Sequence, residues 1–182
     1  MRRLVTSLLV LGAISATIGV GHAQKGLSTG PNLDGIENAR RIEENKARER
    51  DGARKAGLAA LQEQNFAAAE QNFTKLLSFD PTTSDASYLM GLAQIGLNKW
   101  PEAKLSLQAA VTNEPKRPEP KARLGVAHMM LGDINSAADQ HDALSAMARE
   151  CQRCPDAKII ADNLIMLDRI LVAATKKPAP AG

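Results

Sequence analysis

The feature that most constrains the fold is a pattern that recurs every 34 residues. A Gly-Leu-Ala triplet at 57–59 returns at 91–93, and it returns as Gly-Val-Ala at 125–127. Other positions keep the same interval: an alanine (Ala69, Ala103, Ala137), a large residue (Phe66, Trp100, Ile134) and an acid before proline (Asp80-Pro81, Glu114-Pro115). Small residues, large residues and helix-breaking prolines that share one period are typical of stacked helix-turn-helix units.

These residues resemble the tetratricopeptide repeat family, over about residues 50–151. The resemblance implies an all-α fold, a right-handed α–α superhelix of three units at about 50–83, 84–117 and 118–151. Each unit would contain a first helix, A, and a second helix, B. A last amphipathic segment, 156–174, is predicted to cap the stack, because a repeat array leaves an apolar end that needs a cover.

Local signals predict where the helices of each unit begin and end. Gly132 and Asp133 should end one helix and cap the next, and Ser84 or Asp85 should cap helix A of the second unit. We expect helices A and B to cross where glycine and alanine remove side-chain bulk. We further expect Phe73, Leu107 and Trp100 to be core, and His141, in the register of Phe73 and Leu107, to pack at a unit boundary.

Residues 1–23 have the composition of a signal peptide. Arg2 and Arg3 precede the uncharged apolar run 4–20, and Gly21 and Ala23 are small residues at the positions that signal peptidase reads. An uncleaved anchor is the alternative. The chain is therefore predicted to be exported, as a periplasmic or secreted protein without a membrane segment after cleavage.

The remaining segments differ sharply in composition. Residues 24–32 read as a disordered linker, 33–50 as a highly charged helix, 51–174 as the repeat domain and 175–182 as a disordered tail. The charged helix is predicted to be solvated and held by ion pairs between residues four apart, or else to be an arm that contacts a partner or the chain itself.

Charge and composition argue against nucleic acid as a partner. Loss of residues 1–23 removes two arginines and no acid, which leaves 21 basic against 20 acidic side chains. A near-neutral chain with 3% aromatic residues offers neither a basic surface nor a stacking platform.

Cys151 and Cys154 form a C-x-x-C pair at the end of the third unit. An oxidising compartment favours a structural disulfide between them, and a thiol–disulfide redox site is the alternative. We expect no catalytic residue, cofactor or metal site. The patterns of nucleophile elbows, phosphate loops and zinc sites are missing, and His128 and His141 stand in packing positions.

The resemblance implies a groove lined by the A helices that holds a segment of another protein. Carried over by register, the groove residues are Arg54, Leu58, Leu61, Asp85, Tyr88, Leu92, Ile95, Val126 and Met129, and Met130 adds an adaptable side chain to this surface. Alternatively, these residues contact neighbouring helices, or the 33–50 helix covers them. The sequence thus predicts a non-catalytic scaffold or adaptor of the cell envelope with a protein or peptide partner. The alternatives are a structural subunit of an envelope assembly, and a redox protein that uses the C-x-x-C.

Overall fold

The computed structural model describes residues 33–176, so the predicted signal peptide, the linker and residues 177–182 of the tail lie outside the described part. Within this range every regular element is a helix. The helices are α1 (Leu33–Gln62), α2 (Phe66–Phe79), α3 (Ser84–Gly96), α4 (Trp100–Asn113), α5 (Pro118–Met130), α6 (Ile134–Glu150) and α7 (Ala157–Lys176).

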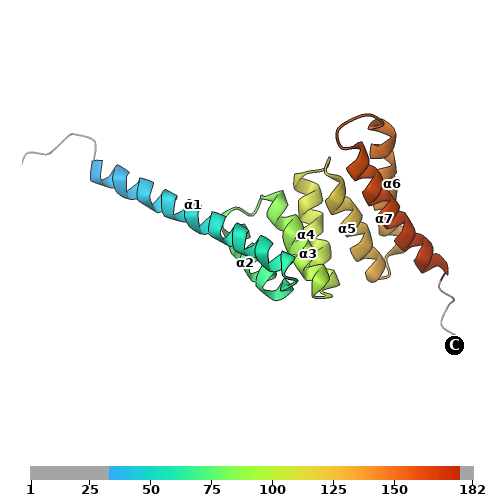
Figure 1. Ribbon diagram of the computed structural model, residues 1–182, viewed down its shortest axis with the longest axis horizontal. Helices are drawn as coiled ribbons and strands as arrows, with labels where there is room; N and C mark the ends of the chain where they lie inside the picture. The colour runs from blue at the N-terminus through green and yellow to red at the C-terminus, as the bar shows by residue number, and fades with distance from the viewer. Residues whose placement is uncertain (1–32, 177–182) are drawn as a thin grey trace, which may run out of the picture.

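The helices form three consecutive pairs, α1–α2, α3–α4 and α5–α6, and each pair packs against the next (Figure 1). Helix α7 packs against both α5 and α6 at the end of the stack. The predicted all-α architecture of three units and a capping helix is therefore confirmed. Helices α1, α3 and α5 are the A helices of the units.

In the first two units, helices A and B cross at the predicted glycines. A Cβ added to Gly57 would lie 2.7 Å from the ring of Phe73, and one added to Gly91 would lie 2.7 Å from Leu107. Both large side chains are fully buried. Only a residue without a side chain allows such an approach, and this explains the Gly at the same place in each unit.

In the third unit the glycine faces a residue from outside the unit. A Cβ added to Gly125 would lie 2.7 Å from Leu167, a residue of α7. His141 was expected to pack at a unit boundary, and it lies half-buried between α6 and α7, without filling the crossing as Phe73 and Leu107 do. Its side chain is 27% exposed, and its Nε2 lies 3.6 Å from an oxygen of Asp168 on α7. Imidazole is costly to bury without partners, so an aliphatic side chain from α7 fills the space instead.

Neighbouring units also meet at a glycine, a contact that the 34-residue period does not indicate. Gly96, the last residue of α3, faces the ring of Phe66 on α2, and an added Cβ would clash with that ring. In the next unit Met130 stands in the register of Gly96, and Trp100 stands in the register of Phe66. Trp100 was expected in the core, but it is only half-buried.

Two of the helix starts are capped by side chains. Asn65 accepts a hydrogen bond from the backbone N–H of Ala68, and Asp133 accepts one from Ser136, as the Gly132-Asp133 signal predicted. Gly132 has a φ of +79°, a conformation that glycine adopts without strain. The prediction for α3 is wrong: Thr83 occupies the N-cap position without a capping side-chain bond.

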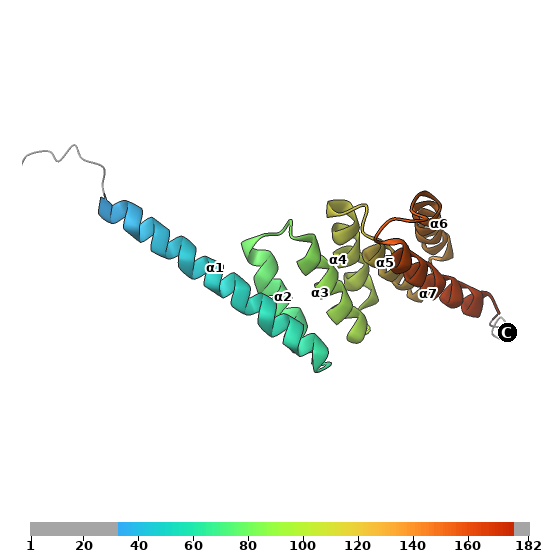
Figure 2. The same ribbon diagram turned by 45° about the horizontal axis from the view of Figure 1, so that its top comes forward.

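The charged segment 33–50 and the first A helix form one continuous helix, α1. Its first half extends away from the body as an arm (Figures 1 and 2). Arg40–Glu44, an ion pair between residues four apart as predicted, supports it, and so does Lys46–Glu43, between residues three apart, each at 2.9 Å. The arm reaches α2 near its base, for example through Lys75–Glu49 at 3.3 Å, and its first half leaves the body rather than lying over the A helices (Figure 2). No helix in the described range is both long and apolar enough to span a bilayer.

Candidate protein-binding groove

The predicted groove residues lie on three A helices, and most of them form a half-buried row. Seven of them, Leu58, Leu61, Tyr88, Leu92, Ile95, Val126 and Met129, are partly exposed. Their inner sides pack on the core: Leu58 and Leu92 contact the cluster around Phe73, and Ile95 contacts the cluster around Leu107. The two predicted roles, contact with neighbouring helices and an apolar surface for a partner, thus apply to the same side chains. These side chains support the core and leave an apolar edge on the surface.

Arg54 and Met130 differ from the rest of the predicted set. Met130 is 55% exposed at the last turn of α5 and does not belong to the half-buried row. The guanidinium of Arg54 reaches across from α1 and donates to the carboxylate of Asp85 on α3. This pair joins the first two units at the end of the row where α3 begins.

Arg117, which was not among the predicted groove residues, organises this end of the row. Its guanidinium lies 3.5 Å from Asp85, 3.6 Å from Glu114 and 3.6 Å from Glu119. It also stacks over the ring of Tyr88, 4.7 Å from the centroid, in a cation–π contact. We call Arg54, Asp85, Tyr88, Arg117 and Glu119 the charged rim. The sequence did mark this position. Arg117 directly precedes Pro118 at the start of an A helix, and the residue at the same position of the preceding unit is the uncharged Thr83.

A surface cavity of about 590 Å³ adjoins the charged rim. It lies between the α4–α5 turn and the first turn of α7, and Arg117 and Glu119 belong to both the cavity and the rim. Pro115, Pro118 and Ile159 supply its apolar walls. The complete lining is Glu114, Pro115, Lys116, Arg117, Pro118, Glu119, Asp156 and Ile159.

A buried lysine holds the α4–α5 turn in place. Lys121 is 8% exposed, and its ammonium donates to the backbone carbonyl of Pro115. Desolvation lowers the pKa of Lys121 from its ordinary value, because burial penalises the charged form. The turn that walls the cavity is thereby anchored to α5.

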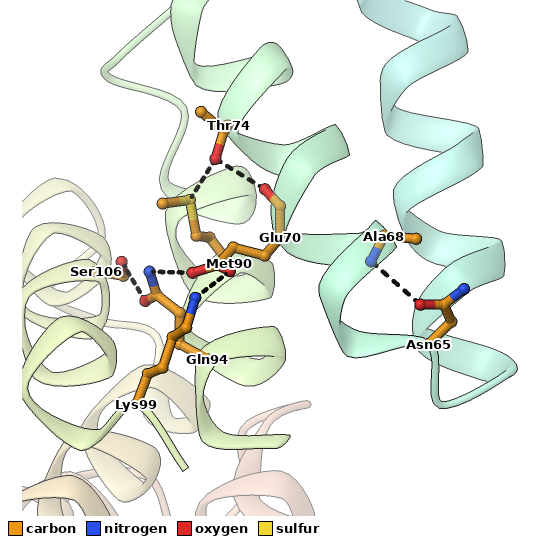
Figure 3. A network of polar contacts seen from close by, with 8 residues as sticks. All are labelled: Asn65, Ala68, Glu70, Thr74, Met90, Gln94, Lys99 and Ser106. Carbon is orange, nitrogen blue, oxygen red and sulfur yellow. Dashed lines mark hydrogen bonds and ion pairs between the residues drawn. The ribbon is translucent and has the colours of Figure 1, made fainter. Parts of the chain in front are cut away.

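Behind the row, a polar network fixes the angle between the first two units (Figure 3). Gln94 on α3 is 3% exposed, and its amide lies 3.4 Å from Glu70 of α2 and accepts a 2.7 Å bond from Ser106 of α4. Glu70 also pairs with Lys99 at 2.6 Å. A buried amide whose donor and acceptor are both satisfied stabilises one arrangement of the three helices.

The third unit replaces this network with a local pair. His128 stands in the register of Gln94, and its Nδ1 lies 3.1 Å from Asp133, which stands in the register of Lys99. Hydrogen bonds from Ser136 hold the pKa of Asp133 below its ordinary value, and His128 adds to this. Neither His128 nor His141 belongs to a group of possible metal ligands within residues 33–176.

Cys151 and Cys154 form a disulfide, with their Cα atoms 5.2 Å apart. Cys151 is the C-cap residue of α6, and Cys154 lies in the turn that leads into α7. The bond therefore joins the last unit to the capping helix, close to Asp156 and Ile159 of the cavity wall. The two cysteines lie at disulfide distance, as the prediction of a structural bond at this junction requires.

No protein-family model matches the sequence, and no curated protein sequence does either. Solved structures do match in fold. The TPR2B domain of yeast Sti1, in a complex with pHsp70, is 18% identical, with a TM-score of 0.57, and the match covers 66% of this chain and 97% of that one. PcrH, in a complex with the chaperone binding region of PopD, is 17% identical, with a TM-score of 0.58, and the match covers 81% and 98%.

The TPR domain of Sgt2 from Aspergillus fumigatus gives the same result. It is 21% identical, with a TM-score of 0.57 over 74% of this chain and 86% of that one. At such identities the likeness concerns the path of the backbone. Together with the 34-residue period and the glycine crossings, it shows that this chain has the tetratricopeptide repeat fold.

Proposed function

We propose that the protein is a non-catalytic interaction scaffold that binds a segment of another protein along its A helices. Yeast Sti1 and PcrH, which share the fold, have been solved with pHsp70 and with a region of PopD, respectively. Because these proteins are less than 20% identical to this chain, their partners cannot be assigned to it. The proposal therefore depends on the surface of this chain itself.

The observation that carries the proposal is the continuity between the half-buried row and the cavity. Tyr88 of the row stacks under Arg117, and Arg117 lines the cavity. An apolar strip bounded by fixed charges and ending in a hollow suits a bound segment, because apolar contact gives affinity and the charges fix its position. An aliphatic side chain of the partner would fit between Pro115, Pro118 and Ile159.

The test is capture of a partner from envelope extract with matched variants. Tyr88→Ala removes the ring under Arg117 and should abolish capture of any partner that uses this strip. Leu105→Ala is the control, because Leu105 is 67% exposed on α4, a B helix. Circular dichroism must first show that both variants fold. A partner that binds wild type and Tyr88→Ala equally would contradict the proposal.

The proposed site of action is the cell envelope, after export. It is supported by the basic start and apolar run of residues 1–23 and by a disulfide, which persists in oxidising compartments. N-terminal sequencing of the purified protein tests it. A mature N-terminus at Gln24 supports cleavage, whereas an intact Met1 in a cytoplasmic fraction contradicts export.

A second candidate, a structural subunit of a larger envelope assembly, is favoured by the arm of α1. Leu33, Ile36 and Ile42 are each at least 55% exposed on a helix that leaves the body (Figure 2). Deletion of residues 24–46 should then reduce the mass of the assembly in native extracts without unfolding the stack. An unchanged mass would contradict a role of the arm in holding such an assembly together.

A further inference from the structure

Helix α7 has two apolar sides, and the stack covers only one of them. Leu167 and Ile160 are buried against the last unit. On the outer side Ile165 is 49% exposed. A shallow hollow of about 460 Å³ runs along this outer side, lined by Asp162, Ile165, Met166, Arg169 and Ile170. The helix that ends a repeat stack normally presents a polar outer face, so this apolar one is unusual.

Two opposite charges lie along the outer side of α7. Asp162 and Arg169 are seven residues apart, two helical turns, and therefore face the same way. Asp162 pairs with Lys158 at 2.6 Å, whereas Arg169 has no ion-pair partner within residues 33–176. The hollow thus has an acidic end, a basic end and an apolar middle.

We propose that the outer side of α7 binds the same helix of a second copy of this chain, antiparallel and about a two-fold axis. In the register that centres on Ile165 and Met166, Asp162 of each copy faces Arg169 of the other. Ile165 of each copy then lies opposite Met166 of the other. A two-fold axis requires a self-complementary patch, and this order of residues supplies one.

The order of the charges favours a second, antiparallel copy of this chain as the partner of α7. In the antiparallel pair both arginines gain a carboxylate, whereas a parallel pair would set like charges side by side. In Figure 1 α7 lies at the end of the molecule opposite the arm of α1, so the dimer leaves the arm accessible. One helix pair about 30 Å long buries less than the roughly 800 Å² per partner of a standard interface, so we expect a weak dimer, with a dissociation constant on the order of micromolar.

The experiment is analytical ultracentrifugation of the full chain, as the cell processes it, from roughly 1 to 200 µM, the range for a small interface. Wild type should pass from monomer to dimer across this range. Arg169→Asp sets two acids against each other, and Asp162→Arg sets two bases against each other. Either change should weaken dimerisation on the order of 100-fold. Arg48→Asp, a charge reversal on the arm, is the matched control and should dimerise like wild type.

Mixing the two singly substituted chains gives the decisive result. A chain with Asp162→Arg carries two bases and a chain with Arg169→Asp carries two acids, so an equimolar mixture should form a heterodimer although neither chain dimerises alone. Wild type that stays monomeric throughout overturns the proposal. So does a dimer that survives both substitutions, since it must use another surface such as the arm, and so does a mixture that remains monomeric.

Discussion

Leu167 of α7 lies against Gly125 of α5, so close that a Cβ on the glycine would be 2.7 Å from a methyl group of the leucine. In the first two units the corresponding glycine faces a large residue of its own unit. The capping helix therefore completes the core of the third unit rather than merely covering it. This explains how the stack accepts His141 at a position that holds Phe73 and Leu107 in the other units.

Leu167→Ala should destabilise the fold by about 2–5 kcal/mol, because it removes buried methyl groups and leaves a cavity at Gly125. The measurement is urea unfolding followed by circular dichroism. Leu105→Ala, at an exposed position of α4, is the control and should change the free energy of unfolding by less than about 0.5 kcal/mol. Equal effects of the two substitutions would show that α7 does not complete the third unit.

Two helical glycines should respond to alanine with opposite signs. Gly96→Ala would drive a methyl group into the ring of Phe66 and should destabilise the contact between the first two units. Gly52→Ala on α1 meets nothing within 4 Å and should stabilise the helix by about 0.5–1 kcal/mol. Thermal unfolding of both variants gives the comparison. A stabilising Gly96→Ala would mean that Phe66 does not pack on α3.

Arg117→Lys should weaken the charged rim despite keeping the charge. Lysine can neither stack flat on Tyr88 nor face three carboxylates with one planar fork, so we expect a loss of about 1 kcal/mol in stability. The loss should shrink in high salt, because these groups are partly exposed. Urea unfolding at low and high ionic strength measures it, with Arg48→Lys on the arm as the control. A loss that is independent of salt would point to packing rather than charge.

The buried ammonium of Lys121 should make stability depend on alkaline pH. Burial lowers the pKa of Lys121 in the folded state, so the unfolded chain binds the proton more strongly. The stability of the wild type should therefore rise, relative to Lys121→Met, as the pH increases through the folded pKa toward 10.5. Parallel pH profiles of unfolding for the two proteins would contradict this.

Reduction of the disulfide should loosen the start of α7 without unfolding the stack. The bond closes a loop of only four residues, so its loss should cost at most about 2 kcal/mol. Hydrogen exchange should increase near Asp156 and Ile159 after reduction. The double variant Cys151→Ser, Cys154→Ser should show the same exchange with and without reductant. A reduction potential above about −300 mV would instead favour the redox alternative.

The charged rim shows how far the sequence could specify the candidate site. The 34-residue register correctly placed Arg54, Asp85 and Tyr88 on the A helices. It did not indicate that Arg54 and Asp85 pair across units, nor that Arg117 joins Asp85 to Tyr88 and to the cavity. Those contacts depend on the angle between the units, which no local pattern encodes.

The sequence by itself determined the repeating unit, the glycine crossings and most helix ends, because periodicity, small residues and proline act within one unit. Only the tertiary structure decided what fills the space beside Gly125, where the α1 arm points and which side of α7 remains apolar and exposed. Leu167 is 42 residues from Gly125 along the chain, outside any repeat. Contacts of that kind arise when the finished units pack together, and that packing is a property of the whole stack.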